Sequence, residues 1–389
     1  MKREVEIVPL WKVTAWDKKF NAVDKSMQEK IIKYKYLLAN ELNNLIEEGG
    51  NIRILYTTKD IAYTTEEKAK EFISEGEIVA IPWGGNATVK YYKGKFVTGD
   101  NRIATSLDTT VLDNKYLYYV LLSRNEEIES YYRGAGIKHP SMIDVLTMQI
   151  PLPSLSEQQR IVDILDKFEG MVENVEKELL LRQKQYEFYR EKVMQFDEAE
   201  IKWKTISEVA SHSTGLTYKP SDVDSTGILV LRSSNIQDDK LCFDNNVYVN
   251  MPVPDKSKVK QDDVLICVRN GSKKLVGKAA IITEAANEMA FGAFMNRLRA
   301  ININSKYLFY VWNSEVTFNQ YKGDDGAPIN QILNKDFDRI KIPVPSLSKQ
   351  QEIVAKLDKF EEMISTLKKE LELRKKQYEY YREKLLTFE

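Results

Sequence analysis

One 46-residue segment occurs twice in this chain. It runs from Pro151 to Phe196 and again, without a gap, from Pro343 to Phe388, and 29 of the 46 positions are identical. An internal repeat of this length constrains the fold more than any other feature, because it indicates that one structural unit occurs twice. We therefore expect the chain to alternate: a globular part, a repeat, a second globular part and a second repeat.

Each copy of the repeat predicts a long helix. In the first copy, Pro153 holds the preceding chain extended, because proline fixes its own φ and restricts its neighbour. Ser156 and Gln159 then match the capping box, in which two side chains bind backbone groups that the helix start leaves unpaired. The second copy has the same residue types, with Ser348 and Gln351 in the box. Both copies are predicted to begin a helix here.

The helical part of each copy carries an apolar seam. Its positions alternate in steps of four and three, which is typical of a coiled coil. The central seam residues are Leu165, Phe168, Val172, Val175, Leu179 and Arg182 in the first copy, and Leu357, Phe360, Ile364, Leu367, Leu371 and Arg374 in the second. Some 40 helical residues would span about 60 Å. We expect the two copies to pair antiparallel, because this places the two globular parts at opposite ends of a rod.

A single polar residue interrupts each seam, at Arg182 and at Arg374. One interpretation is that it fixes the register of the pair, as isolated polar seam residues do elsewhere. The other is that its stem lies along the seam while its guanidinium reaches solvent. The sequence leaves both interpretations open.

Length and composition set the outer limits. A chain of 389 residues predicts two or three domains, and 43% hydrophobic with 30% charged residues is typical of a soluble protein. No apolar run reaches membrane-spanning length, and the N-terminus lacks the apolar core of a signal peptide. Two cysteines favour reduced thiols and a cytoplasmic protein. The predicted domain boundaries are 1–150, 151–200, 201–342 and 343–389.

The globular parts predict a mixed α+β fold. In 1–150, the spacing of apolar residues predicts a helix over Ser26–Gly50 and another over 114–133, with strands between them, for example at 77–85. Residues 201–342 follow the same plan with looser matching. The predicted fold class is therefore α+β, with two related globular domains separated by two long helices that form an antiparallel coiled coil.

The sequence offers little for catalysis. Gly271–Ala279 resembles a phosphate-binding loop, but five residues instead of four separate its glycines, and Ala279 stands where a magnesium-binding hydroxyl is needed. His139 and His212 are the only histidines, and no Cys/His cluster has the spacing of a metal site. Neither a nucleophile motif nor a patterned carboxylate pair is present. These absences favour recognition over catalysis.

Polar loops that mix Arg, Asn, Ser, Thr and Lys are the candidate recognition sites. Such side chains read base edges and bind phosphate, although each loop alone also fits an ordinary solvated turn. The net charge of −1 argues against nucleic acid, but residues 201–342 have 19 Lys and Arg against 16 Asp and Glu, a distribution that permits a basic groove without demonstrating one. The candidate DNA-binding residues are Thr57, Thr58, Lys59, Trp83, Asn86 and Lys90 in the first globular part, and Thr217, Tyr218, Arg232, Ser233, Asn235, Arg269, Asn270, Ser272, Lys273 and Lys274 in the second.

The repeated motif PxPSLSxQQxIVxxLDKF, followed by KEL and LRxKQYExYREK, resembles the specificity (S) subunit of Type I restriction–modification systems. The resemblance covers essentially the whole chain. In the second globular part it extends to WKTISEVA, GILVLRSSNI and DDVLICVRNGSKKLVGKAA. The resemblance implies two target-recognition domains joined by antiparallel helices, and a bipartite double-stranded DNA target with one half-site per domain and a spacer set by the helices.

The resemblance also implies partners and a division of labour. A non-catalytic chain of this kind would bind two methylation (M) subunits, which methylate adenine with S-adenosylmethionine, and restriction (R) subunits that use ATP and Mg²⁺. No cofactor is expected in this chain itself. Two other classes of protein stay open. An adaptor with two protein-binding heads predicts no sequence-selective retention on DNA, and a self-sufficient DNA-modifying enzyme predicts S-adenosylmethionine binding by the chain alone.

Overall fold

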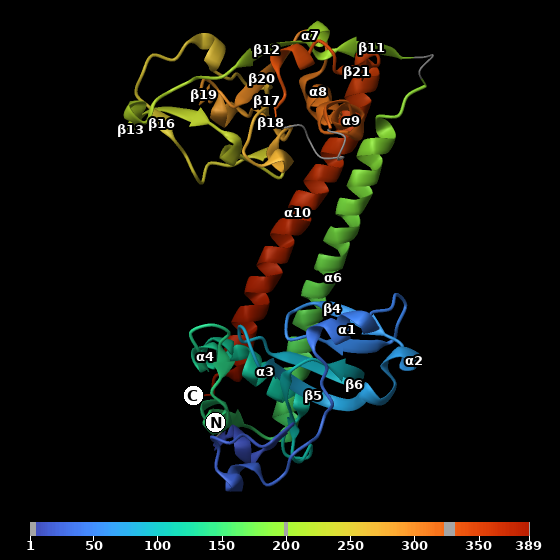
Figure 1. Ribbon diagram of the computed structural model, residues 1–389, viewed down its shortest axis with the longest axis vertical. Coiled ribbons are helices and arrows are strands. Elements are labelled where there is room, and N and C mark those ends of the chain that lie inside the picture. Colours follow the sequence, from blue (N-terminus) through green and yellow to red (C-terminus); the bar gives the residue numbers. More distant parts are fainter. Residues whose placement is uncertain (1–4, 198–200, 323–330, 389) are drawn as a thin grey trace. The chain divides into compact units, whose positions relative to one another are not determined.

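The computed structural model describes residues 5–197, 201–322 and 331–388 (Figure 1). The chain forms two compact units. Unit 1 contains Met1–Glu176 and Glu370–Glu389, and unit 2 contains Lys177–Lys369. Each unit holds one globular head together with part of both long helices. The first head spans residues 5–152 and the second head spans residues 202–344.

The first head is built on a six-stranded sheet of order β2-β7-β5-β6-β3-β4. All neighbours in this sheet are antiparallel except β3 and β6, which are parallel. Separate two-stranded ribbons join β1 to β10 and β8 to β9. The strands are β1 (Glu6–Pro9), β2 (Thr14–Trp16), β3 (Ile52–Leu55), β4 (Ile61–Thr64), β5 (Ser74–Pro82), β6 (Lys90–Thr98), β7 (Asn101–Ser106), β8 (Tyr132–Arg133), β9 (His139–Pro140) and β10 (Gln149–Leu152). The helices are α1 (Ala39–Leu45), α2 (Glu66–Ala69), α3 (Asn114–Ser123), α4 (Asn125–Ser130) and α5 (Met142–Thr147).

The second head contains smaller sheets. The main ones have the orders β12-β20-β17-β18 and β16-β13-β19, while β11 pairs with β21 and β14 with β15. The strands are β11 (Lys202–Thr205), β12 (Ala210–Thr214), β13 (Val223–Leu231), β14 (Ile236–Gln237), β15 (Lys240–Leu241), β16 (Tyr248–Val249), β17 (Val264–Cys267), β18 (Ala279–Ile281), β19 (Ala290–Phe291), β20 (Met295–Ala300) and β21 (Lys341–Val344). The helices are α7 (Ile206–Val209), α8 (Ser305–Trp312) and α9 (Glu315–Tyr321). Both heads have an antiparallel strand pair next to a long helix, β1–β10 and β11–β21, but their other sheets have different strand orders.

The long helices α6 (Leu155–Val193) and α10 (Leu347–Leu386) form as expected. In unit 1, Phe168 near the start of α6 stacks on Tyr381 near the end of α10, with ring centroids 4.7 Å apart. In unit 2, Tyr189 near the end of α6 stacks on Phe360 near the start of α10, at 5.3 Å. Within each unit the start of one helix therefore lies beside the end of the other, so the helices pair antiparallel. In the described part of the chain, no helix combines the length and apolar character needed to cross a bilayer.

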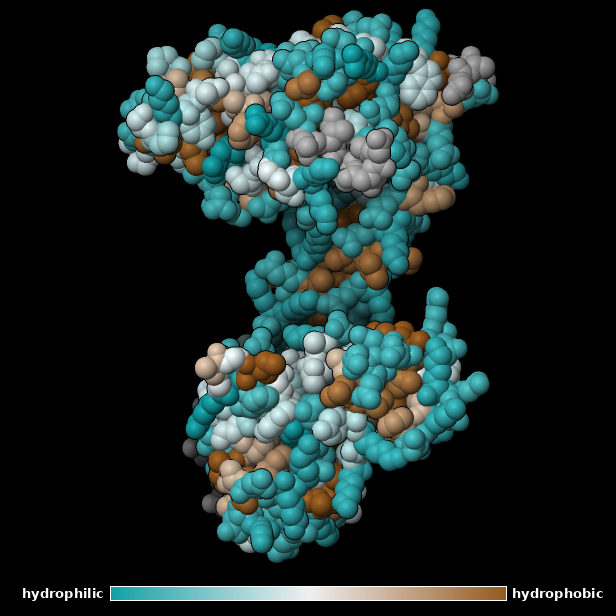
Figure 2. Space-filling model, in the orientation of Figure 1, coloured by the Kyte–Doolittle hydropathy of each residue, from teal (hydrophilic) through white to brown (hydrophobic). Residues whose placement is uncertain are grey.

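The helix ends belong to the cores of the heads. Ile161 and Leu165 of α6, together with Leu386 of α10, pack into the main core of unit 1, next to Tyr116 and Leu117 of α3. In unit 2 the start of α10 enters the core in the same way, through residues such as Leu357. Burying apolar side chains in a shared core holds each head on its helices. Figure 2 shows that hydrophilic side chains cover most of the visible face of both heads.

The seam arginines bind their own helices. Arg182 donates from Nε to Glu178 at 2.7 Å and from Nη1 to Gln185 at 2.8 Å. Arg374 donates from Nη2 to Glu370 at 3.4 Å. Among the described residues, no hydrogen bond or ion pair of these two guanidinium groups crosses to the other helix. This geometry supports the interpretation that each stem follows the seam while its guanidinium reaches the helix surface.

The helix predicted over Ser26–Gly50 is wrong. Only a 3₁₀ turn at Lys25–Gln28 and helix α1 form there, and the chain between them is irregular apart from two isolated bridges. Ile31 and Tyr36 form isolated parallel bridges to the six-stranded sheet. Backbone groups that a helix would pair internally are thus paired with strands, and this tertiary contact overrides the local periodicity.

The predicted capping boxes are also wrong. Helix α6 begins one residue before Ser156, so Ser156 and Gln159 lie inside its first turns, and Gln159 donates to Asp163 at 2.9 Å. In α10, Ser346 accepts from the backbone N–H of Lys349 at 3.4 Å. In α10 the serine that precedes the leucine, Ser346, is therefore the capping residue. The start of each helix was predicted too late by two residues.

Candidate nucleic-acid interface

A buried glutamine fastens the first head to α6. Gln158 is fully buried, and its Oε1 accepts a hydrogen bond from the backbone N–H of Asp113 at 2.9 Å. Its Nε2 donates to the carbonyl oxygens of Val111 and Pro153, both at 2.9 Å. Asp113 in turn caps α3 by accepting from the N–H of Tyr116. One side chain therefore links the start of α3 to the start of α6.

The second head repeats this link with equivalent residues. Gln350 is 1% exposed, accepts from the backbone N–H of Asn304 at 2.8 Å, and donates to Pro345 at 2.8 Å. Asn304 caps α8 by accepting from the N–H of Tyr307. The first glutamine of each QQ pair is thus a structural residue that the motif contains but that our sequence reasoning missed.

Tyrosines of α3 and α8 complete the attachment. Tyr116 donates to Pro151 O at 3.0 Å, and Tyr307 donates to Pro343 O at 2.9 Å. Tyr310 donates to the carboxylate of Asp358 at 2.7 Å. Burial raises the pKa of all three phenols, so each keeps the proton that it donates. We call these glutamine and tyrosine contacts the head–helix clamp.

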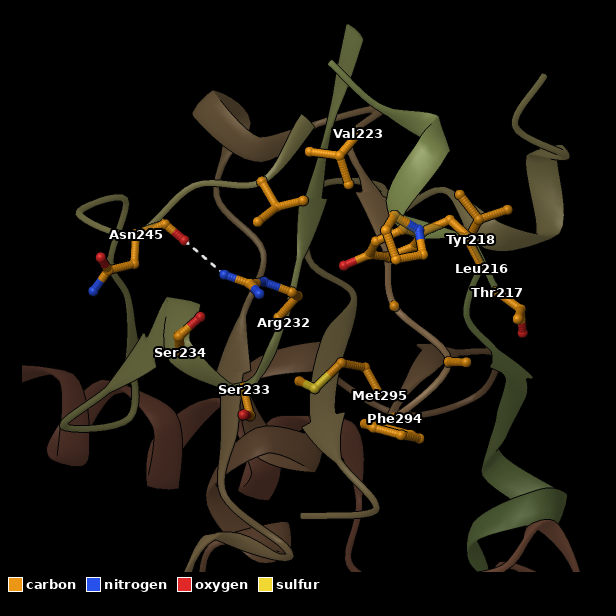
Figure 3. A pocket seen from close by; sticks show the side chains of 14 residues that line it. Leu216, Thr217, Tyr218, Val223, Arg232, Ser233, Ser234, Asn245, Phe294 and Met295 are labelled. Carbon is orange, nitrogen blue, oxygen red and sulfur yellow. Dashed lines mark hydrogen bonds between the residues drawn. The ribbon is translucent and has the colours of Figure 1, made fainter. Parts of the chain in front are cut away.

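The second head contains a pocket of about 870 Å³ (Figure 3). It lies between the segment after β12, the end of β13, the loop before β16 and the turn before β20. Leu216, Thr217, Tyr218, Pro220, Val223, Arg232, Ser233, Ser234, Asn245, Val247, Gly292, Ala293, Phe294 and Met295 line it. Four candidate DNA-binding residues from separate segments therefore meet at one place: Thr217, Tyr218, Arg232 and Ser233.

A second candidate loop is attached to the rim of this pocket. Asn270 donates from Nδ2 to Ser233 Oγ at 2.9 Å, and its Oδ1 accepts from the backbone N–H of Ser272 at 3.0 Å. The guanidinium carbon of Arg269 lies 5.2 Å from the ring centroid of Phe294, which lines the pocket. The exposed residues Ser272, Lys273 and Lys274 follow on the same loop.

Asn235 has a different role from the one predicted. It is fully buried, its Oδ1 accepts from the backbone N–H of Arg232, and its Nδ2 donates to Cys242 O at 3.0 Å. Its amide therefore holds the turn after β13 together and faces no open surface. We correct its assignment from a DNA contact to a residue that shapes the loop carrying Arg232.

The candidates of the first head gather around the segment that joins β6 to β7. Trp83 donates its backbone N–H to Asp100 O at 2.9 Å, and its ring centroid lies 4.0 Å from the guanidinium carbon of Arg102. Lys90 donates to Tyr56 O, beside the turn that carries Thr57, Thr58 and Lys59. Thr58 and Lys59 are exposed, as is Asn86 in the loop after Trp83. Burial lowers the pKa of Lys90 to about 8.

This chemistry suits binding and orientation. Arginine, asparagine, serine and threonine side chains offer donors and acceptors to base edges, and exposed lysines offer charge to phosphates. Among the described residues, no group of three or more His, Cys, Asp or Glu side chains is placed to hold a metal ion.

Comparisons with known proteins point to one family. A family model described as the "Type I restriction modification DNA specificity domain" matches residues 6–181 and again 199–374. The specificity subunit of the Type I restriction enzyme EcoR124I/EcoR124II of Escherichia coli is 26% identical, over 99% of this chain and 95% of its own. A putative Type I specificity subunit of Haemophilus influenzae is 26% identical, over 94% and 98%.

A solved structure has the same fold. The crystal structure of a Type I restriction–modification S subunit from M. genitalium aligns over 100% of this chain and 98% of its own, with a TM-score of 0.61 and 18% identity. Both copies of the family domain lie in this chain, and each includes one head and most of one long helix. The chain belongs to the family of Type I restriction–modification specificity subunits, which are not themselves the catalytic subunits.

Proposed function

We propose that this chain recognises a bipartite DNA sequence, with one half-site bound by each head and the spacer set by the paired helices. The observation that carries the proposal is the duplicated head–helix clamp. Gln158 and Gln350 each accept from the backbone N–H of the residue that caps the facing helix of the head. Tyr116 and Tyr307 each donate to the carbonyl oxygen of the equivalent proline before the long helix. Two heads fastened rigidly to the same two helices are suited to reading two short sequences at a fixed separation.

The proposed target-recognition domains keep the predicted boundaries 1–150 and 201–342. The first would read DNA through Thr57, Thr58, Lys59, Trp83, Asn86 and Lys90, and the second through Thr217, Tyr218, Arg232, Ser233, Arg269, Asn270, Ser272, Lys273 and Lys274. A good bidentate contact discriminates against the wrong base by about 1–3 kcal/mol. Because the heads are tethered, the second engagement is intramolecular, so two modest half-sites can combine into tight binding.

The proposal assigns catalysis to partner subunits. Methylation subunits would bring S-adenosylmethionine and modify adenine in the sequence that this chain selects, and restriction subunits would bring ATP-dependent cleavage. Family membership supports this division of labour. One solved chain of similar fold, with a TM-score of 0.56 and 16% identity, comes from a structure that addresses complex assembly and conformational transition of the Type I R–M system.

Long-read sequencing of modified adenines tests the proposal. Cells that carry this gene with its methylation subunit are compared with cells that lack this gene alone. We expect a single two-part motif with an unspecified spacer, and its loss when the gene is absent. An undivided motif, or a motif that persists without this gene, would show that the chain does not select the target.

The spacer is tested by lengthening both helices. The two stacked ring pairs share one register, Phe168 with Tyr381 and Tyr189 with Phe360, which places Val175 across from Arg374. Seven residues inserted after each of these positions preserve the seam and add about 10 Å of helix. We expect the methylated motif to keep both half-sites and to gain about three base pairs of spacer, at 3.4 Å per base pair. A control that replaces seven surface residues without changing the length should leave the spacer as it is.

A further inference from the structure

The pocket of the second head contains two polar atoms that no described residue satisfies. They are Nε of Arg232 and Oγ of Ser234, and both are buried without a hydrogen-bond partner within the described part of the chain. Buried polar atoms in folded proteins nearly always have partners. Both atoms belong to residues that line the same pocket, so its wall offers hydrogen-bonding groups to a ligand.

Arg232 gives the pocket its charge. It is the one charged residue among the described residues that line the pocket, and no carboxylate lines it. Its Nη2 donates to the carbonyl oxygen of Asn245 at 3.1 Å, in an exposed part of the loop before β16 (Figure 3). A guanidinium has five N–H donors, so most of its capacity remains for a ligand. The pocket therefore favours a group that is rich in hydrogen-bond acceptors.

The walls of the pocket favour a flat and partly apolar ligand. Tyr218 lies across the pocket from Arg232 in Figure 3, and Phe294 and Met295 lie below. Phe294 is 57% exposed, so its ring offers an apolar surface to a ligand. A hydrated phosphate would leave these walls uncovered, whereas the major-groove edge of a base pair offers acceptors to the guanidinium beside apolar atoms that can contact the walls.

Of the four bases, guanine fits the donors best. Its major-groove edge presents two adjacent acceptors, O6 and N7, and arginine binds both in a bidentate manner. Adenine and cytosine present an amino donor at this edge, which would face the guanidinium donors, and thymine offers a single acceptor. We propose that this pocket reads one guanine in the half-site of the second head, with Arg232 as the residue that selects it; this inference rests on the proposed function.

Base analogues test this proposal directly. The wild-type chain in complex with its methylation subunits is titrated with duplexes that carry the methylated motif. Each guanine of one half-site is replaced in turn by 7-deazaguanine, which lacks N7, or by inosine, which keeps both N7 and O6. We expect 7-deazaguanine to weaken binding about 5- to 150-fold at a single position, the range for one bidentate contact, and inosine to have little effect there.

Variants of Arg232 identify the residue that reads this guanine. Arg232→Met keeps the length of the stem, and Arg232→Lys keeps the charge but loses the bidentate fork. With Arg232→Met, 7-deazaguanine should cause no further loss, and the methylome should relax at one position of one half-site only. With Arg232→Lys, which can still donate to N7 or O6, the loss caused by 7-deazaguanine should be smaller than in wild type. Arg339→Met is the matched control, because Arg339 is exposed and does not line the pocket. Thermal unfolding of each complex excludes a misfolded variant.

Three results would overturn the inference. The half-site could contain no guanine, 7-deazaguanine could weaken wild type and Arg232→Met equally, or Arg232→Met could weaken all sequences equally and reduce the salt dependence by about one phosphate contact. The last outcome would identify a phosphate site. If Arg232→Met does not fold, the analogue titration of wild type and Arg232→Lys decides the question. If wild-type cells showed no two-part methylation motif, the proposed function itself would be refuted. This result differs from the three above, so failure of the guanine inference and failure of the proposed function are distinguishable.

Discussion

Gln158 accepts a hydrogen bond from the backbone N–H of Asp113 at 2.9 Å, so a helix and a head that are 45 residues apart in sequence share one buried amide. Gln350 and Asn304 repeat the contact at 2.8 Å in the second unit. The two heads are therefore attached to their long helices by the same contact. Their sheets, which carry the candidate recognition loops, have different strand orders.

Replacing Gln158 by alanine should therefore loosen the first head. The change leaves the N–H of Asp113 and two carbonyl oxygens without their partner in a buried place, which costs about 1–3 kcal/mol. The denaturant midpoint of unit 1 should fall accordingly. Gln159→Ala is the matched control, because Gln159 is exposed and binds only Asp163 of its own helix among the described residues. Equal effects of the two variants would contradict the role assigned to Gln158.

The aromatic pair of unit 1 makes a second prediction. The rings of Phe168 and Tyr381 are nearly parallel, at 16°, with centroids 4.7 Å apart. A double-mutant cycle with Phe168→Leu and Tyr381→Leu should give a coupling free energy of about 0.5–1.5 kcal/mol. Leu373→Ala serves as the control partner, because Leu373 of α10 is 66% exposed. A coupling energy of zero between Phe168 and Tyr381 would show that the stacking adds nothing to the helix pair.

Variants of Arg182 and Arg374 test whether these residues fix the register of the helix pair or only lay their stems along the seam. If Arg182 only follows the seam, Arg182→Leu removes a guanidinium that binds its own helix and adds apolar contact, so stability should be unchanged or higher. If Arg182 fixes register, the variant should gain stability but lose a single oligomeric state. Denaturation combined with light scattering of Arg182→Leu and Arg374→Leu distinguishes these outcomes, and we expect one unchanged species.

The two long paired helices could be predicted because the spacing of apolar residues in the repeat is typical of a coiled coil. A seam such as Leu165 to Leu179 depends only on neighbours along one helix, so periodicity is enough to predict it. The candidate loops were found by composition in the same way, and Thr217, Tyr218, Arg232 and Ser233 meet in one pocket although up to 16 positions separate them in sequence.

What the sequence did not predict depends on contacts between distant segments. Asn235 and Asn270 are both asparagines in polar loops, but the fold buries Asn235 and leaves Asn270 at the rim of the pocket. Gln158 and Gln159 are adjacent and identical, but the seam spacing counted back from Leu165 places Gln158 on the apolar face, which is the signal that could have identified it. The prediction of a helix over Ser26–Gly50 was wrong because Ile31 and Tyr36 form bridges to distant strands in place of the internal hydrogen bonds of a helix.

The amine of Lys90 should make the stability of unit 1 depend on pH. Burial and the nearby Arg53 lower its pKa from 10.5 to about 8 in the folded chain. Between pH 8 and 10.5 the unfolded chain therefore binds more protons at this position, and the contribution of Lys90 to the free energy of unfolding should rise with pH. The difference between wild type and Lys90→Met, measured at several pH values, should show this slope. A difference that is independent of pH would mean that the amine titrates normally.

Lys274 should contribute charge to DNA binding without reading sequence. It is exposed on the loop that Asn270 ties to the pocket, where a flexible ammonium can approach a phosphate. Lys274→Ala should weaken binding to all sequences alike and lower the slope of log K against log salt by about 0.9, the value for one phosphate contact. Lys202→Ala, at an exposed lysine of β11, is the matched control and should leave the slope unchanged. A changed methylation motif in Lys274→Ala would instead show that this lysine reads a base, because a phosphate contact carries no sequence information.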